Sequence, residues 1–239
     1  MNIQLFIPCF VDQLYPDTAF NMIRVLEKAG CMVQYNKEQT CCGQPAFNAG
    51  FQEDAKEVCI KFLKDFNGTD YIVSPSASCT GFVKNYYKEL FIDSSHNKEV
   101  KNISKRIYEF SDFLVNVLHQ EDFNASLTGK ATYHDSCAAL RECKIKTEPR
   151  KLLSLVKGLE LVEMEDVETC CGFGGSFAVK FESISLAMAD QKVNHAIKTG
   201  AEYMISTDLS CLMHLDGYIR YKRLPLKTLH IADVLSSGW

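Results

Sequence analysis

Two short stretches of the chain repeat one pattern: TCCGQPAFN at residues 40–48 and TCCGFGGSF at residues 169–177. One cysteine precedes each pair by 31 or 32 intervening residues, and another follows it after 36 or 39. Matched cysteines of the two halves are offset by 128, 129, 129 and 132 residues. The second half is therefore an internal duplicate of the first, with only a few residues inserted.

The repeat accounts for eight of the 11 cysteines. They are Cys9, Cys41, Cys42 and Cys79 in the first half, and Cys137, Cys170, Cys171 and Cys211 in the second. Four thiolates are a ligand set that both zinc and iron–sulfur clusters accept. The spacing therefore predicts one metal centre in each half. The glycine after each pair, Gly43 or Gly172, is expected to bring the backbone close and to donate an amide hydrogen bond to sulfur.

Length and composition exclude several other roles for these thiols. With 239 residues and 46% hydrophobic content, the chain can bury a full core without the disulfides that small secreted domains need. No stretch approaches the roughly 20 apolar residues of a membrane span, and no signal-peptide pattern opens the chain. We therefore expect a protein of the reducing cytoplasm. The net charge of −4, with scattered lysines and arginines, predicts no nucleic-acid partner.

Short apolar runs precede the cysteines, and helical patterns follow them. The predicted strands are 3–7, 31–35 and 71–73 in the first half, and 131–134, 159–162 and 203–206 in the second. The predicted helices are 17–29, 51–66 and 82–90, then 148–156, 184–198 and 212–221. This alternation predicts an α/β protein of two pseudo-symmetric modules, each a small, mainly parallel sheet flanked by helices. Because ligands bind beyond the carboxyl ends of such strands, the cysteine loops should converge there, at a cleft that the two modules share.

The predicted modules are residues 1–125 and 126–239. A polar stretch, 93–101, and a predicted helix, 104–118, form the connector in the first of them. The apolar segment 229–235 and Trp239 are expected to pack the second module closed.

Several motifs carry a resemblance to a known family. They are PCFVD at 8–12, TCCGQPAFN at 40–48, YHDSC at 133–137, CCGFGG at 170–175 and DLSCLM at 208–213. Together they resemble the cysteine-rich CCG modules shared by heterodisulfide reductase B-type subunits, glycolate oxidase iron–sulfur subunits and lactate-utilisation proteins, and above all the A-type of the last group. The similarity covers essentially the whole chain.

This resemblance implies an iron–sulfur electron-transfer subunit, with one or two clusters of the [4Fe–4S] type on the eight cysteines. It implies a system that oxidises L-lactate to pyruvate and passes electrons towards the respiratory chain, with other iron–sulfur subunits as partners and lactate as a candidate ligand. The chain shows no flavin or nicotinamide fingerprint and no Ser-His-Asp or paired-carboxylate arrangement. We therefore expect an oxidoreductase component that lacks complete activity alone, with substrate oxidised on another subunit.

The chain departs from the family pattern at three positions. Ser76 and Asp208 stand where the heterodisulfide reductase type has the first cysteine of a Cys-x-x-Cys element, and Ala138 stands where a histidine is common. Each half therefore offers four thiols in place of five. Ser76 and Asp208 either cap the helices that follow them or supply oxygen to iron, and capping is favoured.

Other interpretations of the same cysteines stay open. Zinc in one half would act as a structural brace, so the chain could also be a zinc-braced scaffold or binding subunit. A dithiol–disulfide switch fits a reducing compartment poorly. A subunit acting directly on a disulfide or a quinone is a further alternative.

Residues near the cysteines are weaker candidates. His134 and His214 are candidate ligands or proton donors, although a histidine at a strand end is more often structural. The glycine loop 172–175 is expected to serve close packing at the metal site rather than phosphate binding. Cys31 and Cys59 are expected in the core, and Cys143 is a minor ligand candidate. Possible carboxylate-binding cations are Arg141, Lys144 and Lys180.

Overall fold

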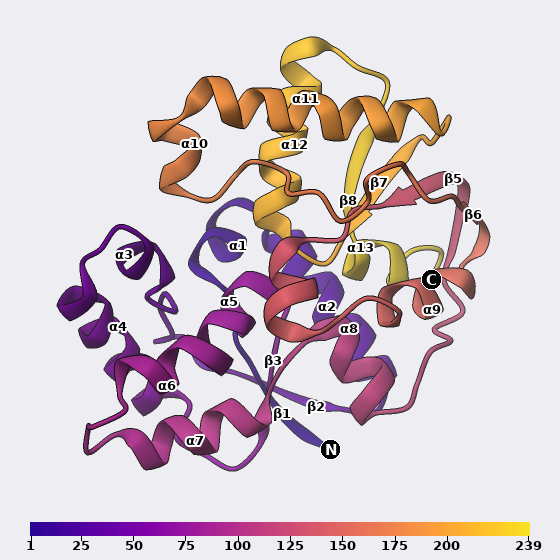
Figure 1. Cartoon of the computed structure of the whole chain (residues 1–239). Helices are drawn as coiled ribbons and strands as arrows, with labels where there is room; N and C mark the ends of the chain where they lie inside the picture. Colours follow the sequence, from indigo (N-terminus) through magenta and orange to yellow (C-terminus); the bar gives the residue numbers. More distant parts are fainter.

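The computed structural model describes residues 1–239 and contains two four-stranded parallel sheets with helices around them (Figure 1). The first sheet has the order β2-β1-β3-β4, and the second has the equivalent order β6-β5-β7-β8. The strands are β1 (Asn2–Leu5), β2 (Met32–Tyr35), β3 (Tyr71–Ser74), β4 (Ile107–Glu109), β5 (Ser126–Tyr133), β6 (Lys157–Leu161), β7 (Tyr203–Ser206) and β8 (Lys227–His230). The predicted duplicated α/β fold is thereby confirmed.

Helices connect the strands in both modules. Those of the first half are α1 (Cys9–Leu14), α2 (Pro16–Lys28), α3 (Gln44–Asn48), α4 (Gln52–Asp65), α5 (Ala77–Gly81), α6 (Tyr87–Leu90), α7 (Asn97–Arg106) and α8 (Phe110–Asp112). Those of the second are α9 (Glu148–Ser154), α10 (Ser176–Lys180), α11 (Glu182–Lys198), α12 (Leu209–Lys222) and α13 (Ile231–Leu235). Three π-helical turns, Phe82–Tyr86, Phe113–Val117 and Ala139–Cys143, complete the helical elements. No helix has the length and apolar character that crossing a bilayer requires.

Local sequence explains the first strand–loop–helix unit. Ile3 and Leu5 of β1 are completely buried between layers of helices. The strand ends before Pro8, and α2 then starts with Pro16 in its first turn, where a missing N–H costs nothing. The helix buries Val25 and its neighbours against β1 and ends before Gly30, whose φ of +80° suits a helix terminus.

One prediction about the connector is wrong. Residues 104–118 do not form one helix, because α7 ends at Arg106 and the chain continues as β4 before turning helical again. The polar stretch 93–101 already contains the start of α7 at Asn97. Strand β8 lies partly inside the predicted packing segment 229–235 and gives the second sheet a fourth strand too.

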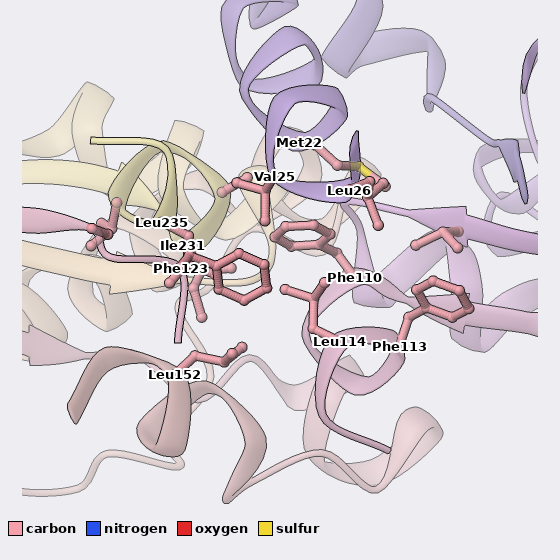
Figure 2. Packing of buried hydrophobic residues seen from close by; sticks show 14 of the residues in the cluster. Met22, Val25, Leu26, Phe110, Phe113, Leu114, Phe123, Leu152, Ile231 and Leu235 are labelled. Atoms are coloured by element: carbon pink, nitrogen blue, oxygen red, sulfur yellow. The ribbon is translucent and has the colours of Figure 1, made fainter. Parts of the chain in front are cut away.

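One hydrophobic core of 27 buried residues runs through both modules (Figure 2). Met22, Val25 and Leu26 of α2 enter it from the first module, and Leu152 of α9 and Ile231 of α13 enter it from the second. Each module adds a smaller core on its outer side, of 15 and 11 residues. The shared core therefore holds the two sheets in a fixed relation.

The C-terminal segment reaches across to the first module rather than only closing the second. Asp233 of α13 accepts hydrogen bonds from Thr18 and Asn21 of α2, each at 3.0 Å. The ammonium group of Lys28 lies over the ring of Trp239, 3.7 Å from the ring centroid.

The first sheet ends at Glu109 and the second begins at Ser126. The module boundary near residue 125 stays a prediction.

Candidate metal centre

All eight repeat cysteines line one cavity of about 460 Å³ at the carboxyl ends of the strands. Cys9 begins α1 after β1, the Cys41–Cys42 pair lies between β2 and α3, and Cys79 lies in α5 after β3. The second set occupies the same places after β5, β6 and β7, at Cys137, Cys170–Cys171 and Cys211. The predicted convergence of the cysteine loops is confirmed. Their service as metal ligands remains a prediction.

The four thiols of the first half form a hydrogen-bonded series. Cys41 accepts hydrogen bonds from the thiols of Cys42 and Cys9, which lower its pKa to about 3. The same contacts raise the pKa of Cys9 and of the fully buried Cys42. Cys42 also contacts Cys79, so the series includes all four residues.

The second half repeats this arrangement. Cys170, the counterpart of Cys41, accepts hydrogen bonds from Cys137 and Cys171, which lower its pKa to about 2. The pKa values of Cys137 and Cys171 are raised by those contacts, and Cys171 also contacts Cys211. Each half thus stabilises a thiolate, the form of cysteine that binds metal.

The glycine after each cysteine pair is required by close contacts. Gly43 and Gly172 share a φ of +92°, and their amides donate to the sulfurs of Cys41 and Cys170 at 3.4 and 3.5 Å. A Cβ at Gly172 would lie 2.7 Å from the carbonyl oxygen of Ser185. The predicted close approach and amide–sulfur hydrogen bonds are confirmed, and close packing explains the first glycine of the loop 172–175.

Ser76 and Asp208 cap helices, as favoured from the sequence. Ser76 accepts a hydrogen bond from the Cys79 amide at 3.4 Å, and Asp208 accepts one from the Ser210 amide at 3.1 Å. Asp208 also accepts from the amide of Ser78 in the other module, at 2.8 Å. It is the one acidic residue that lines the cavity. Its carboxylate therefore joins the start of α12 to the start of α5.

His134 differs from the structural histidine expected from the sequence. It is completely buried, yet neither ring nitrogen has a hydrogen-bond partner. One of its nitrogens and the sulfurs of Cys171 and Cys211 all lie within 4.8 Å of one another. Burial, together with the nearby charge of Lys192, lowers the pKa of His134 to about 3. The expectation of a satisfied histidine is therefore wrong here, while His214 does have a partner in the Ser185 hydroxyl at 3.2 Å.

The remaining candidates lie outside the cavity lining. Cys31 and Cys59 are buried in the hydrophobic cores, as predicted. Cys143 donates to the Ala77 carbonyl oxygen at 3.4 Å and does not line the cavity. None of the three candidate cations lines it either: Arg141, Lys144 and Lys180.

Sequence reasoning missed one cation near the second cysteine set. Lys192 of α11 is 1% exposed, and it donates hydrogen bonds to the carbonyl oxygens of Asp166 and Val167. Burial lowers the pKa of Lys192, while negative charge on Cys171 and Cys170 raises it. The available signal was a cation at an apolar position of the repeat, because aligning α11 with α4 places Lys192 where the first half has Phe62.

The donor set fits a sulfur-ligated metal group. Eight thiols face one cavity, two backbone amides already donate to sulfur, and the cavity has no lysine or arginine in its lining. Thiolate-only sets are accepted by iron–sulfur clusters and by zinc, whereas magnesium and calcium require oxygen ligands.

Comparison with known proteins agrees with the duplicated cysteine pattern. The family model of the CCG cysteine-rich domain matches residues 3–84 and again residues 131–216. "Lactate utilization protein A 2" of Bacillus cereus (strain 03BB102) is 43% identical over 239 residues, which cover 100% of this chain and 99% of that protein. "Lactate utilization protein A" of Geobacillus sp. (strain WCH70) is 40% identical over 237 residues, covering 99% and 100%.

A solved structure supports the fold. The crystal structure of a hypothetical protein from Helicobacter pylori superimposes with a TM-score of 0.61 at 12% identity, over 100% of this chain and 49% of that one. At that identity the similarity concerns the fold alone. The two domain matches and the full-length relatives together show that the chain belongs to the CCG cysteine-rich domain family, within the group of the lactate utilization A proteins.

Proposed function

We propose that this chain is an iron–sulfur electron-transfer subunit of a cytoplasmic system that oxidises L-lactate to pyruvate. The observation that carries the proposal is the convergence of eight thiols on one cavity, four from each module. The names of the full-length relatives supply the lactate-utilisation context. Electrons would leave the system towards the respiratory chain.

Within this proposal, each half contributes four cysteines to one centre of the [4Fe–4S] type. The first set is Cys9, Cys41, Cys42 and Cys79, and the second is Cys137, Cys170, Cys171 and Cys211. A bound cluster would supply one-electron chemistry. The chain's own contribution is the stabilised thiolates at Cys41 and Cys170, the amide donors of Gly43 and Gly172, and burial of the ligands. Hydrogen bonds to sulfur and limited solvent exposure are what tune such a centre's potential.

Lactate oxidation itself is assigned to a partner subunit. A lactate carboxylate is bound best by arginine or lysine, and neither lines the cavity. The only carboxylate in the lining is that of Asp208, which, with the thiolates of Cys41 and Cys170, would repel the anion. Other iron–sulfur proteins of the same system are therefore the proposed partners.

The test is metal analysis of the full chain purified without oxygen. We expect iron and acid-labile sulfide, visible absorption, and an electron paramagnetic resonance (EPR) signal after reduction with dithionite. Cys42→Ser and Cys171→Ser should each remove about half of the iron, because each disrupts one module. Cys31→Ala is the matched control, since Cys31 is buried away from the cavity and should leave the iron content unchanged.

One result would overturn the proposal, and another would narrow it. A colourless protein that carries zinc in both halves would make the chain a braced scaffold. Zinc in one half with iron in the other would keep the electron-transfer role and restrict it to one module.

A further inference from the structure

The two cysteine sets are embedded in different surroundings despite their matched spacing. Three residues before Cys137 the chain has His134, and three residues before Cys9 it has Phe6. Both side chains are completely buried, directly after the first strand of each module. Phe6 packs against aromatic neighbours, and its ring centroid lies 4.8 Å from that of Phe62 in an edge-on contact.

The ring nitrogens of His134 have no hydrogen-bond partner. A buried polar group without a hydrogen bond destabilises a fold, and both ring nitrogens of His134 are in that state. The ring is not isolated, because one nitrogen lies with the sulfurs of Cys171 and Cys211 in a group whose members are all within 4.8 Å. The unpartnered imidazole therefore lies beside two cysteines of the second set.

We propose that His134 binds metal as a nitrogen ligand of the second centre, so that this centre has five protein donors and the first has four. The inference rests on the proposed metal-binding function and deepens it. It makes the second centre a mixed histidine–cysteine site, while the first remains a thiolate-only site. The metal is a transition ion that accepts both nitrogen and sulfur, such as iron or zinc.

The distances suit a shared ion. Metal bonds of about 2.0 Å to histidine nitrogen and about 2.3 Å to cysteine sulfur put donor atoms that share one tetrahedral ion roughly 3.5–3.8 Å apart. The group around His134 is slightly wider than this, within 4.8 Å, so modest side-chain rotations would close it around an ion. All three residues are buried, which keeps water from competing for the ion.

The second module also differs in charge. Lys192 takes the position that Phe62 holds in the first module, and its ammonium group donates to two carbonyl oxygens. This cation offsets negative charge on Cys170 and Cys171, whereas the first set has Phe62 in the equivalent place. The second site has therefore diverged from the first at two buried positions, and both changes introduce a nitrogen group.

The experiment is an anaerobic titration of the metal-free full chain with Co²⁺, whose absorption spectrum reports its ligands. The wild-type chain is compared with His134→Phe, which reproduces the first module's residue. We expect the wild type to bind two ions and the variant to bind one of them at least about tenfold more weakly, with the spectrum of that ion altered. His195→Phe is the control, because His195 lies in the same module with a ring nitrogen 3.0 Å from a carbonyl oxygen.

Each outcome decides the inference. Equal affinities and spectra for the wild type and His134→Phe would overturn it while leaving metal binding by the chain intact. A wild-type chain that binds no metal would overturn the proposed function as well. If His134→Phe does not fold, the wild type labelled with ¹⁵N-histidine replaces it. Pulsed EPR on bound Co²⁺ should then detect a directly coordinated histidine nitrogen, and its absence would refute the ligand role.

Discussion

Single residues decide how closely the backbone can approach the sulfurs. The amides of Gly43 and Gly172 reach Cys41 and Cys170 only because both glycines adopt a φ of +92°. At Gly43 the nearest obstacle is a side-chain sulfur, that of Cys59, 3.0 Å from the position of an added Cβ. At Gly172 it is the backbone oxygen of Ser185, which cannot rotate away. Gly172 therefore tolerates an added side chain less well than Gly43 does.

We predict that Gly172→Ala destabilises the fold by about 2–3 kcal/mol and weakens metal binding in the second module. The left-handed backbone costs a residue with a side chain about 1 kcal/mol, and the contact of 2.7 Å with the Ser185 oxygen adds strain. Urea unfolding of the metal-free protein measures the first effect, and iron content measures the second.

Gly200→Ala isolates the contribution of the contact. Gly200 also has a positive φ, +72°, but nothing lies within 4 Å of an added Cβ. Gly200→Ala should lower stability only by the cost of the left-handed backbone and leave the iron content unchanged. Equal destabilisation by the two substitutions would show that the Ser185 contact is relieved without cost.

At the scale of elements, the strands that lead into cysteine loops could be predicted from the sequence, and the fourth strand of each sheet, β4 or β8, could not. β1, β3 and β7 are short apolar runs that end at a break in the pattern. β4 has only three residues, Ile107 to Glu109, and ends in a carboxylate that would ordinarily mark an exposed position. Only the pairing of β4 with β3 makes it a strand, and a single sequence does not reveal that pairing.

The same limit applies within the site. The eight cysteines could be predicted because thiols at matched intervals are rare and chemically specific. The orphaned nitrogens of His134 could not, because its lack of partners depends on which groups the fold places around it. The burial of Lys192 could not be predicted either, because it depends on how α11 packs.

Glu109 makes the end of β4 sensitive to pH. Its carboxylate accepts hydrogen bonds from the amides of Ser111 and Asp112 at 2.8 and 3.2 Å, while its other oxygen has no partner. Complete burial raises the pKa of Glu109 from 4.5 to about 8. The folded chain therefore holds a proton that the unfolded chain has released between these two pH values.

We predict that Glu109 contributes stability below about pH 4.5 and loses this contribution as the pH rises through about 8. The slope in that window is at most about 1.4 kcal/mol per pH unit, because one proton is involved. Glu109→Gln should flatten the pH dependence of the unfolding free energy, measured by urea denaturation from pH 5 to 8. Glu27→Gln, at an exposed position of α2, should leave the slope as it is in the wild type, and an unchanged slope in Glu109→Gln would contradict the prediction.

At the scale of the whole molecule, one cavity and one core belong to both modules. The cavity takes four cysteines from each, and the core takes side chains from α2, α9, α13 and the connector (Figure 2). The carboxylate of Asp208 adds a direct link, because it caps α12 and accepts from the Ser78 amide of the other module. The relative position of the two cysteine sets therefore depends on the same contacts that stabilise the fold.

We predict that the two modules unfold together. Trp239 is the only tryptophan and lies against Lys28 of the first module, so its fluorescence reports docking of the C-terminal segment, while circular dichroism reports all helices. Both signals should give one coincident transition in urea.

Phe123→Ala removes a ring that is 2% exposed in the shared core. It should lower the free energy of unfolding obtained from both signals by about 3–5 kcal/mol. Phe181→Ala, at a 53% exposed position, should change stability by less than about 0.5 kcal/mol. A fluorescence transition that precedes the loss of helix would mean that the modules separate before they unfold, and that the shared core does not couple them.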